Sequence, residues 1–175
     1  MKQLLGIGIA LLLFAACGPN ADKSKAEIEG LRQQLATATT FPLDTVTAGQ
    51  LIEKSRAYAD RFPEDTASAR LLFQAAEVSK AIAKHPQAIE LWRRVADKYP
   101  AYAKAPESLF LIAFTYDNDV ADKENAVESY QAFIDKYPQH ELADDAQQLL
   151  GYLKSGKTIE DIMKEFEQAA KDSLQ

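Results

Sequence analysis

A thirteen-residue pattern that occurs three times constrains the fold of this 175-residue chain more than any other feature. Each copy has a β-branched residue followed by Glu near its start, and it ends in Asp, a basic residue, an aromatic residue and Pro. The copies are Leu51–Pro63, Ala88–Pro100 and Ala126–Pro138. The closing prolines recur after 37 and then 38 residues, a period typical of stacked supersecondary units. We therefore expect an array of similar units, an architecture that holds partners.

Apolar residues at helical spacing indicate that each unit is a pair of helices. Thr47 is the expected cap of the first regular helix, Asp117–Lys123 should form a polar turn, and Gly156 should end the sixth helix. A capping box from Thr158 to Asp161 predicts one more helix. The expected helices cover residues 47–61, 66–83, 87–99, 106–116, 124–137, 142–153 and about 158–166. The fold class is all-α, a short α-solenoid with capping terminal helices.

The helix pairs resemble tetratricopeptide repeats over roughly residues 45–166. In this family the first helix presents a large residue, Leu, a small residue and Tyr, and the second presents Ala, an aromatic residue and Pro. The best match consists of Leu109, Ile112, Ala113, Tyr116, Ala126, Tyr130 and Pro138. The small residues expected to let helices approach closely are Ala76, Ala88, Ala113, Ala126 and Gly151. The long period and the Tyr-Pro ends are similar to repeats of barrel-assembly and Tol-Pal-associated envelope proteins.

The N-terminus has the layout of a secretory leader: Lys2, an apolar run over 4–14, and small residues before Cys17. The segment Leu13–Cys17 resembles the lipobox of bacterial lipoproteins, and an ordinary cleaved leader is the alternative. The resemblance implies acylation of Cys17 and attachment to a membrane, and Gly18 after the cysteine favours the outer membrane. The leaflet, periplasmic or surface, stays open.

The domain organisation follows from these features. Residues 1–16 are the expected signal peptide, 17–43 a tether with a short helix, 44–168 the tetratricopeptide-like domain, and 169–175 a polar tail. Within the tether, Ile28, Leu31 and Leu35 would share one helix face. Gly30 weakens that helix, which should be ordered only where it docks on another surface. Whether it docks on the repeats or dimerises is not decided by the sequence.

The predicted binding site is the groove that the first helices of the pairs line in tetratricopeptide repeats. Phe110 and Phe114, four residues apart, would form an aromatic stripe there, rimmed by polar groups. The full set of predicted groove residues is Arg70, Phe73, Glu77, Glu107, Phe110, Phe114, Gln148 and Tyr152. The alternative is that Phe110 and Phe114 pack inside their own repeat or against the end helices. Both interpretations stay open at this point.

Other patterns exclude several functions. The net charge of −6 and the absence of a basic cluster argue against nucleic acid as a partner. Residues 151–158 fit the phosphate-binding loop G-x-x-x-x-G-K-T, but a buried strand should precede such a loop, and a helix is expected here. The acidic residues of 117–124 lack the glycine and the final glutamate of a calcium loop. We therefore expect no catalytic residues, no metal and no cofactor.

These observations favour a membrane-anchored adaptor that binds an envelope protein or a peptide segment of one. An accessory subunit of an outer-membrane protein assembly machine and a purely structural spacer are the alternatives. A nucleotide-binding enzyme has only the phosphate-loop pattern in its favour. The sequence decides neither the partner nor the oligomeric state.

Overall fold

The computed structural model describes residues 20–37 and 43–157, together with positions 161, 163, 164, 168 and 171. The predicted leader, Cys17, the Thr158 cap, most of the last expected helix and the polar tail lie outside these residues. All regular secondary structure in the described residues is helical. Its elements are α1 (Ala21–Thr37), α2 (Thr45–Arg61), α3 (Thr66–Ala81), α4 (His85–Lys98), α5 (Ala105–Thr115), the π-helical turn η1 (Tyr116–Val120), α6 (Lys123–Lys136) and α7 (Ala143–Ser155).

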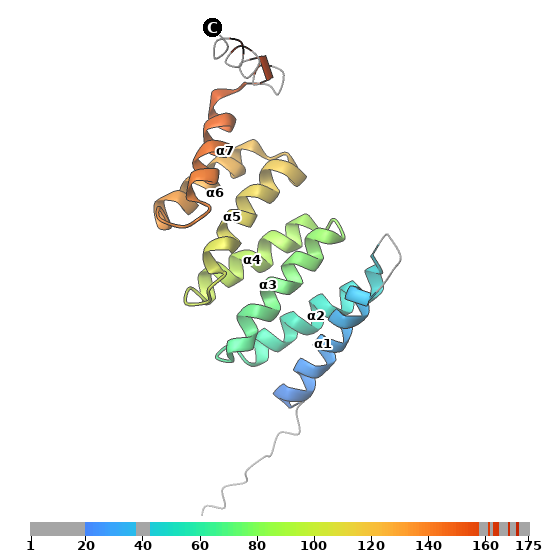
Figure 1. Ribbon diagram of the computed structural model, residues 1–175. Coiled ribbons are helices and arrows are strands. Elements are labelled where there is room, and N and C mark those ends of the chain that lie inside the picture. Colours follow the sequence, from blue (N-terminus) through green and yellow to red (C-terminus); the bar gives the residue numbers. More distant parts are fainter. Residues whose placement is uncertain are drawn as a thin grey trace, which may run out of the picture.

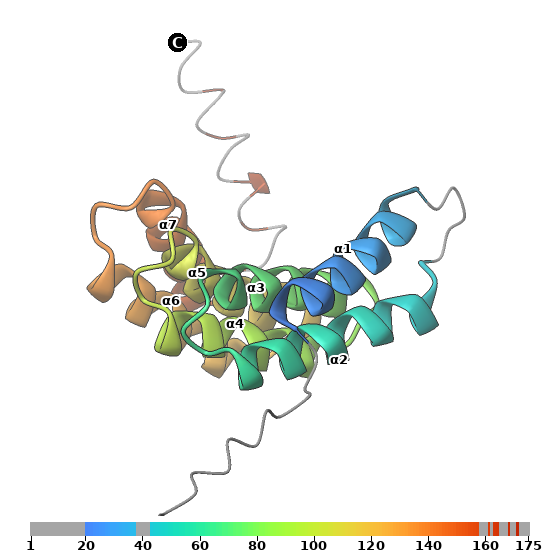
Figure 2. The same ribbon diagram turned by 90° about the horizontal axis from the view of Figure 1, so that it is seen from below.

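The helices stack in chain order, each packed on the next from α1 to α7 (Figure 1). Turned by 90°, the stack shows two layers, with α2, α4 and α6 on one side and α1, α3, α5 and α7 on the other (Figure 2). Because α1 and α7 rise at the two ends, the layer of α1, α3, α5 and α7 lines the concave face. This arrangement confirms the expected all-α solenoid.

The repeated aromatic-proline ends stop the second helix of each pair. The helices α2, α4 and α6 end at Arg61, Lys98 and Lys136, one residue before the aromatic residue of each pattern. Proline cannot continue the helix, since it lacks the backbone donor and its ring clashes with the preceding turn. Pro86 and Pro106 instead stand in the first turn of α4 and α5, where that donor is not needed.

The cap of α2 differs from the prediction. Asp44 is the N-cap residue, and its carboxylate accepts a hydrogen bond from the backbone N–H of Val46 at 3.0 Å. Thr47 lies inside the first turn and donates its hydroxyl hydrogen to Asp44. Asp44 stands three residues before Thr47, and its carboxylate can accept hydrogen bonds from backbone N–H groups at the start of a helix. The helix therefore begins earlier than expected, at Thr45.

Small residues allow the close packing of neighbouring pairs, as the sequence indicated. Ala76, Ala88, Ala113 and Ala126 are each fully buried. The prediction for Gly151 is wrong, because this residue is exposed and a Cβ placed on it would meet no described atom within 4 Å. The reason is its place on α7, the last described helix, where no described neighbour covers that face.

The expected polar turn at 117–123 is also different, because α5 continues into η1. The turn closes with the N–H of Asp122 donating to the carbonyl of Tyr116 at 2.8 Å, around Ala121 in the left-handed conformation. A π-helical turn widens the helix end and re-aims its side chains. It brings Asp119 to Lys80 of α3, with which it forms an ion pair.

The helix predicted within residues 17–43 extends further than Ile28–Leu35 and is docked on the repeats. It is α1, which packs on α2 and buries Ile28 and Leu35 to 2% and 8% exposure. An ion pair of 2.8 Å between Lys54 and Glu27 spans the same interface. Structurally, α1 therefore pairs with α2 as the first hairpin of the stack and not as part of a free tether.

Candidate functional site

The candidate site is the concave face, where side chains of α3 and α5 lie next to one another. Arg70 and Glu77 project from α3 and are exposed, while Glu107 is half-buried on α5. The arrangement follows from the repeat register, since residues 37 positions apart occupy the same place on successive first helices. The structure thus brings together the predicted groove residues of α3 and α5.

Phe73 contributes differently from the prediction, because it is 1% exposed and forms the floor of this face. Its ring lies edge-on to Tyr102, with centroids 6.3 Å apart, and the Nζ atom of Lys104 sits 4.6 Å above it. Tyr102 and Lys104 come from the α4–α5 connection and were not predicted. No periodic pattern marks these two residues, so sequence reasoning had no signal for them.

Phe110 packs inside its own repeat, which is the alternative that the sequence left open. Its ring is edge-on to Tyr130 and to Phe133, with centroids 5.8 and 5.7 Å away. Both partners lie on α6 and are fully buried. Phe110 therefore holds α5 against α6, and a ligand could reach only the part of its ring that is still exposed.

Phe114 lies further along α5, is half-buried, and stacks against Phe110 at a centroid distance of 6.2 Å. The Nζ atom of Lys80 is 5.8 Å from its ring centre, and the same ammonium pairs with Asp119. Lys80 thus links α3, α5 and η1. Phe110 packs against two buried aromatic rings of α6, whereas the ring contact of Phe114 is with Phe110. Of the two predicted phenylalanines, Phe114 is therefore the one that a partner could contact more easily.

The predicted residues of α7 line a separate part of the concave layer. Gln148 donates its side-chain N–H to the hydroxyl oxygen of Tyr152 at 2.9 Å. Tyr152 borders a pocket of about 320 Å³ that Asp117 of η1 and Leu149 also line. Burial raises the pKa of the Asp117 carboxyl. This pocket is next to η1, so the predicted stripe divides into an α3–α5 region and an α5–α7 region.

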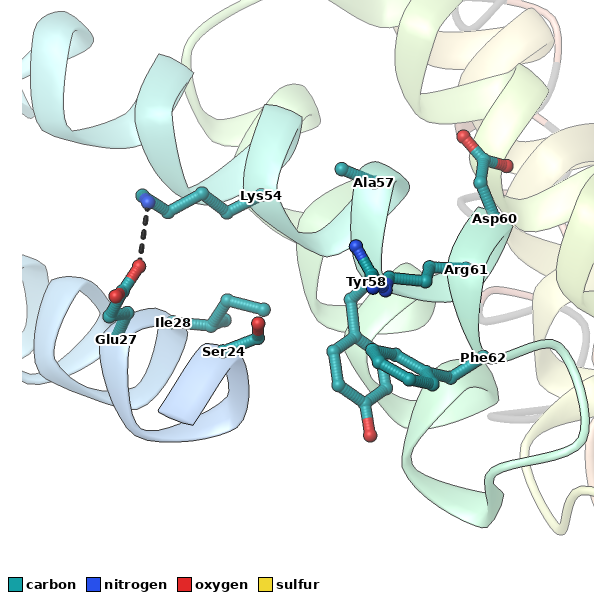
Figure 3. A pocket seen from close by; sticks show the side chains of 9 residues that line it. All are labelled: Ser24, Glu27, Ile28, Lys54, Ala57, Tyr58, Asp60, Arg61 and Phe62. Atoms are coloured by element: carbon teal, nitrogen blue, oxygen red, sulfur yellow. Dashed lines mark hydrogen bonds and ion pairs between the residues drawn. The ribbon is translucent and has the colours of Figure 1, made fainter. Parts of the chain in front are cut away.

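A pocket of about 580 Å³ lies between α1 and α2, away from the predicted groove (Figure 3). Tyr58 and Phe62 form its apolar wall, and Glu27 and Lys54 face one another across it. The pairing of Lys54 with Glu27 lowers the pKa of that carboxyl. The other charged residues of the lining are Asp60, which pairs with Arg94, and Arg61, whose guanidinium lies 5.6 Å from the ring centre of Phe62.

The described residues contain no group of three or more His, Cys, Asp or Glu side chains placed to hold a metal ion. Residues 151–158 also lack the structural context of a phosphate-binding loop, because residues 151–155 belong to α7 and the residues directly before them, 143–150, are helical and form no strand. Gly156 ends that helix in the left-handed conformation, as predicted. Within residues 20–37 and 43–157, no helix is both long and apolar enough to cross a bilayer.

Comparison with known protein families agrees with this geometry. Residues 70–102 and 107–140 each match the family model of the tetratricopeptide repeat. Two stretches of the chain are therefore similar to tetratricopeptide repeats. The first spans nearly all of α3 and α4 and the second α5 and α6, so the repeats coincide with the two central helix pairs. No curated protein matches the chain as a relative. Tetratricopeptide repeats mediate protein–protein interaction, and the fold is typically a non-catalytic scaffold.

Proposed function

We propose that this protein is a membrane-anchored adaptor of the bacterial cell envelope, which binds a segment of another envelope protein on the concave face formed by α3 and α5. The observation that carries the proposal is the concave face itself, where Arg70, Glu77 and Phe114 remain accessible beside a packed aromatic floor. The lipobox-like segment before Cys17 supports the anchor.

The short distance between Cys17 and the folded body determines what such an anchor would do. Only three residues separate Cys17 from Ala21, the first residue of α1. At roughly 3.5 Å per residue, the four steps span at most about 14 Å. Three acyl chains would make the attachment effectively irreversible, since each buried methylene contributes about 0.8 kcal/mol. The adaptor would therefore present its groove close to the membrane surface.

The test is a crosslinked pull-down from native cells with the intact protein, Cys17→Ala and Phe114→Ala. We expect Cys17→Ala to leave the membrane fraction, and Phe114→Ala to remain there but lose the partner. A convex-face variant, Glu128→Gln on α6, serves as the control because Glu128 is exposed on a helix of the other layer. Capture that survives in full in Phe114→Ala would overturn the groove, and membrane attachment of Cys17→Ala would overturn the lipid anchor.

A further inference from the structure

The concave face of α3 carries two opposite charges, Arg70 and Glu77, that form no ion pair among the described residues; Glu29 is near Arg70 and Lys104 is near Glu77, but each of these is paired with another residue. Arg70 and Glu77 are exposed, and neither has an oppositely charged group within ion-pair distance among the described residues. The guanidinium of Arg70 donates only to the amide oxygen of Gln74, at 3.2 Å. The neighbouring charges are paired, Lys80 with Asp119 and Lys104 with Glu107.

The surroundings of Glu77 make it more than an ordinary surface carboxylate. Burial raises the pKa of its carboxyl, Lys104 opposes this shift, and Glu107 adds to it. Lys104 is already committed, with its Nζ atom 3.3 Å from Glu107 and 4.6 Å from the ring centre of Phe73. A partly desolvated carboxylate whose nearest cation is paired with a second carboxylate is unfavourable. A positively charged group of a ligand that paired with Glu77 would offset this unfavourable desolvation.

The spacing of the two charges indicates the form of the ligand. Arg70 and Glu77 are seven residues apart on one helix, which corresponds to about 10.5 Å along the axis of α3. A segment in the polyproline II conformation has three residues per turn and rises about 3.1 Å per residue, so side chains three positions apart lie on the same face, roughly 9 Å apart. Gln74 lies between the two charges, where its amide could contact the backbone of such a chain. Arginine is suited to bidentate binding of a carboxylate.

We propose that this face of α3 selects a segment in the polyproline II conformation with a Lys or Arg side chain at Glu77 and an Asp or Glu side chain at Arg70, three residues apart. This inference rests on the proposed function and specifies the chemistry of its partner. The order of the two charges along the segment fixes the direction in which the segment lies on α3.

A random ten-residue peptide library, displayed on phage and selected on the immobilised full-length protein, tests this pairing. We expect the selected peptides to share a basic and an acidic residue three positions apart. A labelled peptide of that consensus should bind Glu77→Lys or Arg70→Glu at least tenfold more weakly by fluorescence anisotropy. A peptide with the two charges exchanged should regain affinity for the double variant Arg70→Glu/Glu77→Lys.

Matched controls carry the same charge changes on the other layer, where Arg93 of α4 and Glu128 of α6 are exposed. Arg93→Glu and Glu128→Lys should bind the consensus peptide as the wild type does, and circular dichroism should show all variants equally helical. A consensus without the charged pair, or equal binding by Glu77→Lys, would overturn this inference and leave the peptide groove standing. Selection of no peptide at all would overturn the proposed function and the inference together.

Discussion

Asp65 joins three helices at one point, and its removal gives a sharp test of the packing. Its carboxylate caps α3 by accepting the N–H of Ala67 at 2.8 Å. It also accepts the hydroxyl hydrogen of Tyr58 from α2, and it lies 3.5 Å from the Nζ atom of Lys25 in α1. Tyr58 is only 2% exposed, so its hydroxyl depends on this carboxylate.

The expected cost of Asp65→Ala is the sum of two losses. Removal of an N-cap costs about 1 kcal/mol. A buried hydroxyl left without a partner adds about 1–3 kcal/mol. The free energy of unfolding should therefore fall by about 2–4 kcal/mol, measured by urea unfolding with circular dichroism at neutral pH. The ion pair with Lys25 is long, at 3.5 Å, and its two side chains are still 33% and 26% exposed, so it should add little.

Asp44→Ala is the matched control, because Asp44 caps α2 in the same way but serves no buried hydroxyl. It should destabilise the protein less than Asp65→Ala does. In a Tyr58→Phe background, the cost of Asp65→Ala should fall to that of the cap alone, since the hydroxyl is gone. Equal losses for Asp44→Ala and Asp65→Ala in the wild-type background would refute the reasoning.

Three further measurements test other parts of the structure. The hydrogen bond from Tyr58, and then that from the backbone of Ala67, lowers the pKa of Asp65. The stability that Asp65 contributes is thus fully present above its unfolded pKa near 4 and is lost as the pH falls through the lower folded pKa. In urea titrations, the difference in free energy of unfolding between wild type and Asp65→Ala should therefore shrink progressively as the pH falls below about 4. Gly30→Ala should raise the free energy of unfolding by about 1 kcal/mol, because the new methyl group meets no atom within 4 Å and alanine favours a helix; no gain in melting temperature would contradict this. Phe110→Ala should lower the free energy of unfolding by about 2–4 kcal/mol through lost packing on α6, clearly more than Phe114→Ala, in the same urea assay.

The sequence predicted the repeat architecture because its signals are local. Prolines that lack a donor end the second helices, and alanines of the same register mark close contacts, as Ala113 and Ala126 do. The π-helical turn η1 was missed because its stabilising contact, between Asp119 and Lys80, joins residues 39 positions apart. The docking of α1 was left open for a similar reason. The spacing of Ile28 and Leu35 defines an apolar helix face but does not say which surface covers it.

The predicted groove residues lie on the helices that the sequence indicated, but the exposure of two of them differs from the prediction. Register alone placed Phe73 and Phe110 on first helices, and both lie there. Their burial depends on side chains from other segments: Tyr102 and Lys104 cover Phe73, while α6 supplies the partners of Phe110. A periodic pattern carries no information about such contacts. The sequence likewise could not predict which charged residues form ion pairs, because pairs such as Lys80 with Asp119 depend on how the helices pack.

The docking of α1 bears on how the proposed anchor and the groove would work together. A spacer that reaches from a membrane to a distant layer needs a long extended segment between the anchor and the folded body. Here α1 is packed on α2 through Ile28 and Leu35, and only residues 18–20 separate Cys17 from it. A lipid on Cys17 would therefore hold the first hairpin at the membrane surface. That favours an adaptor whose partner segment lies close to the bilayer over a spacer that bridges to a remote one.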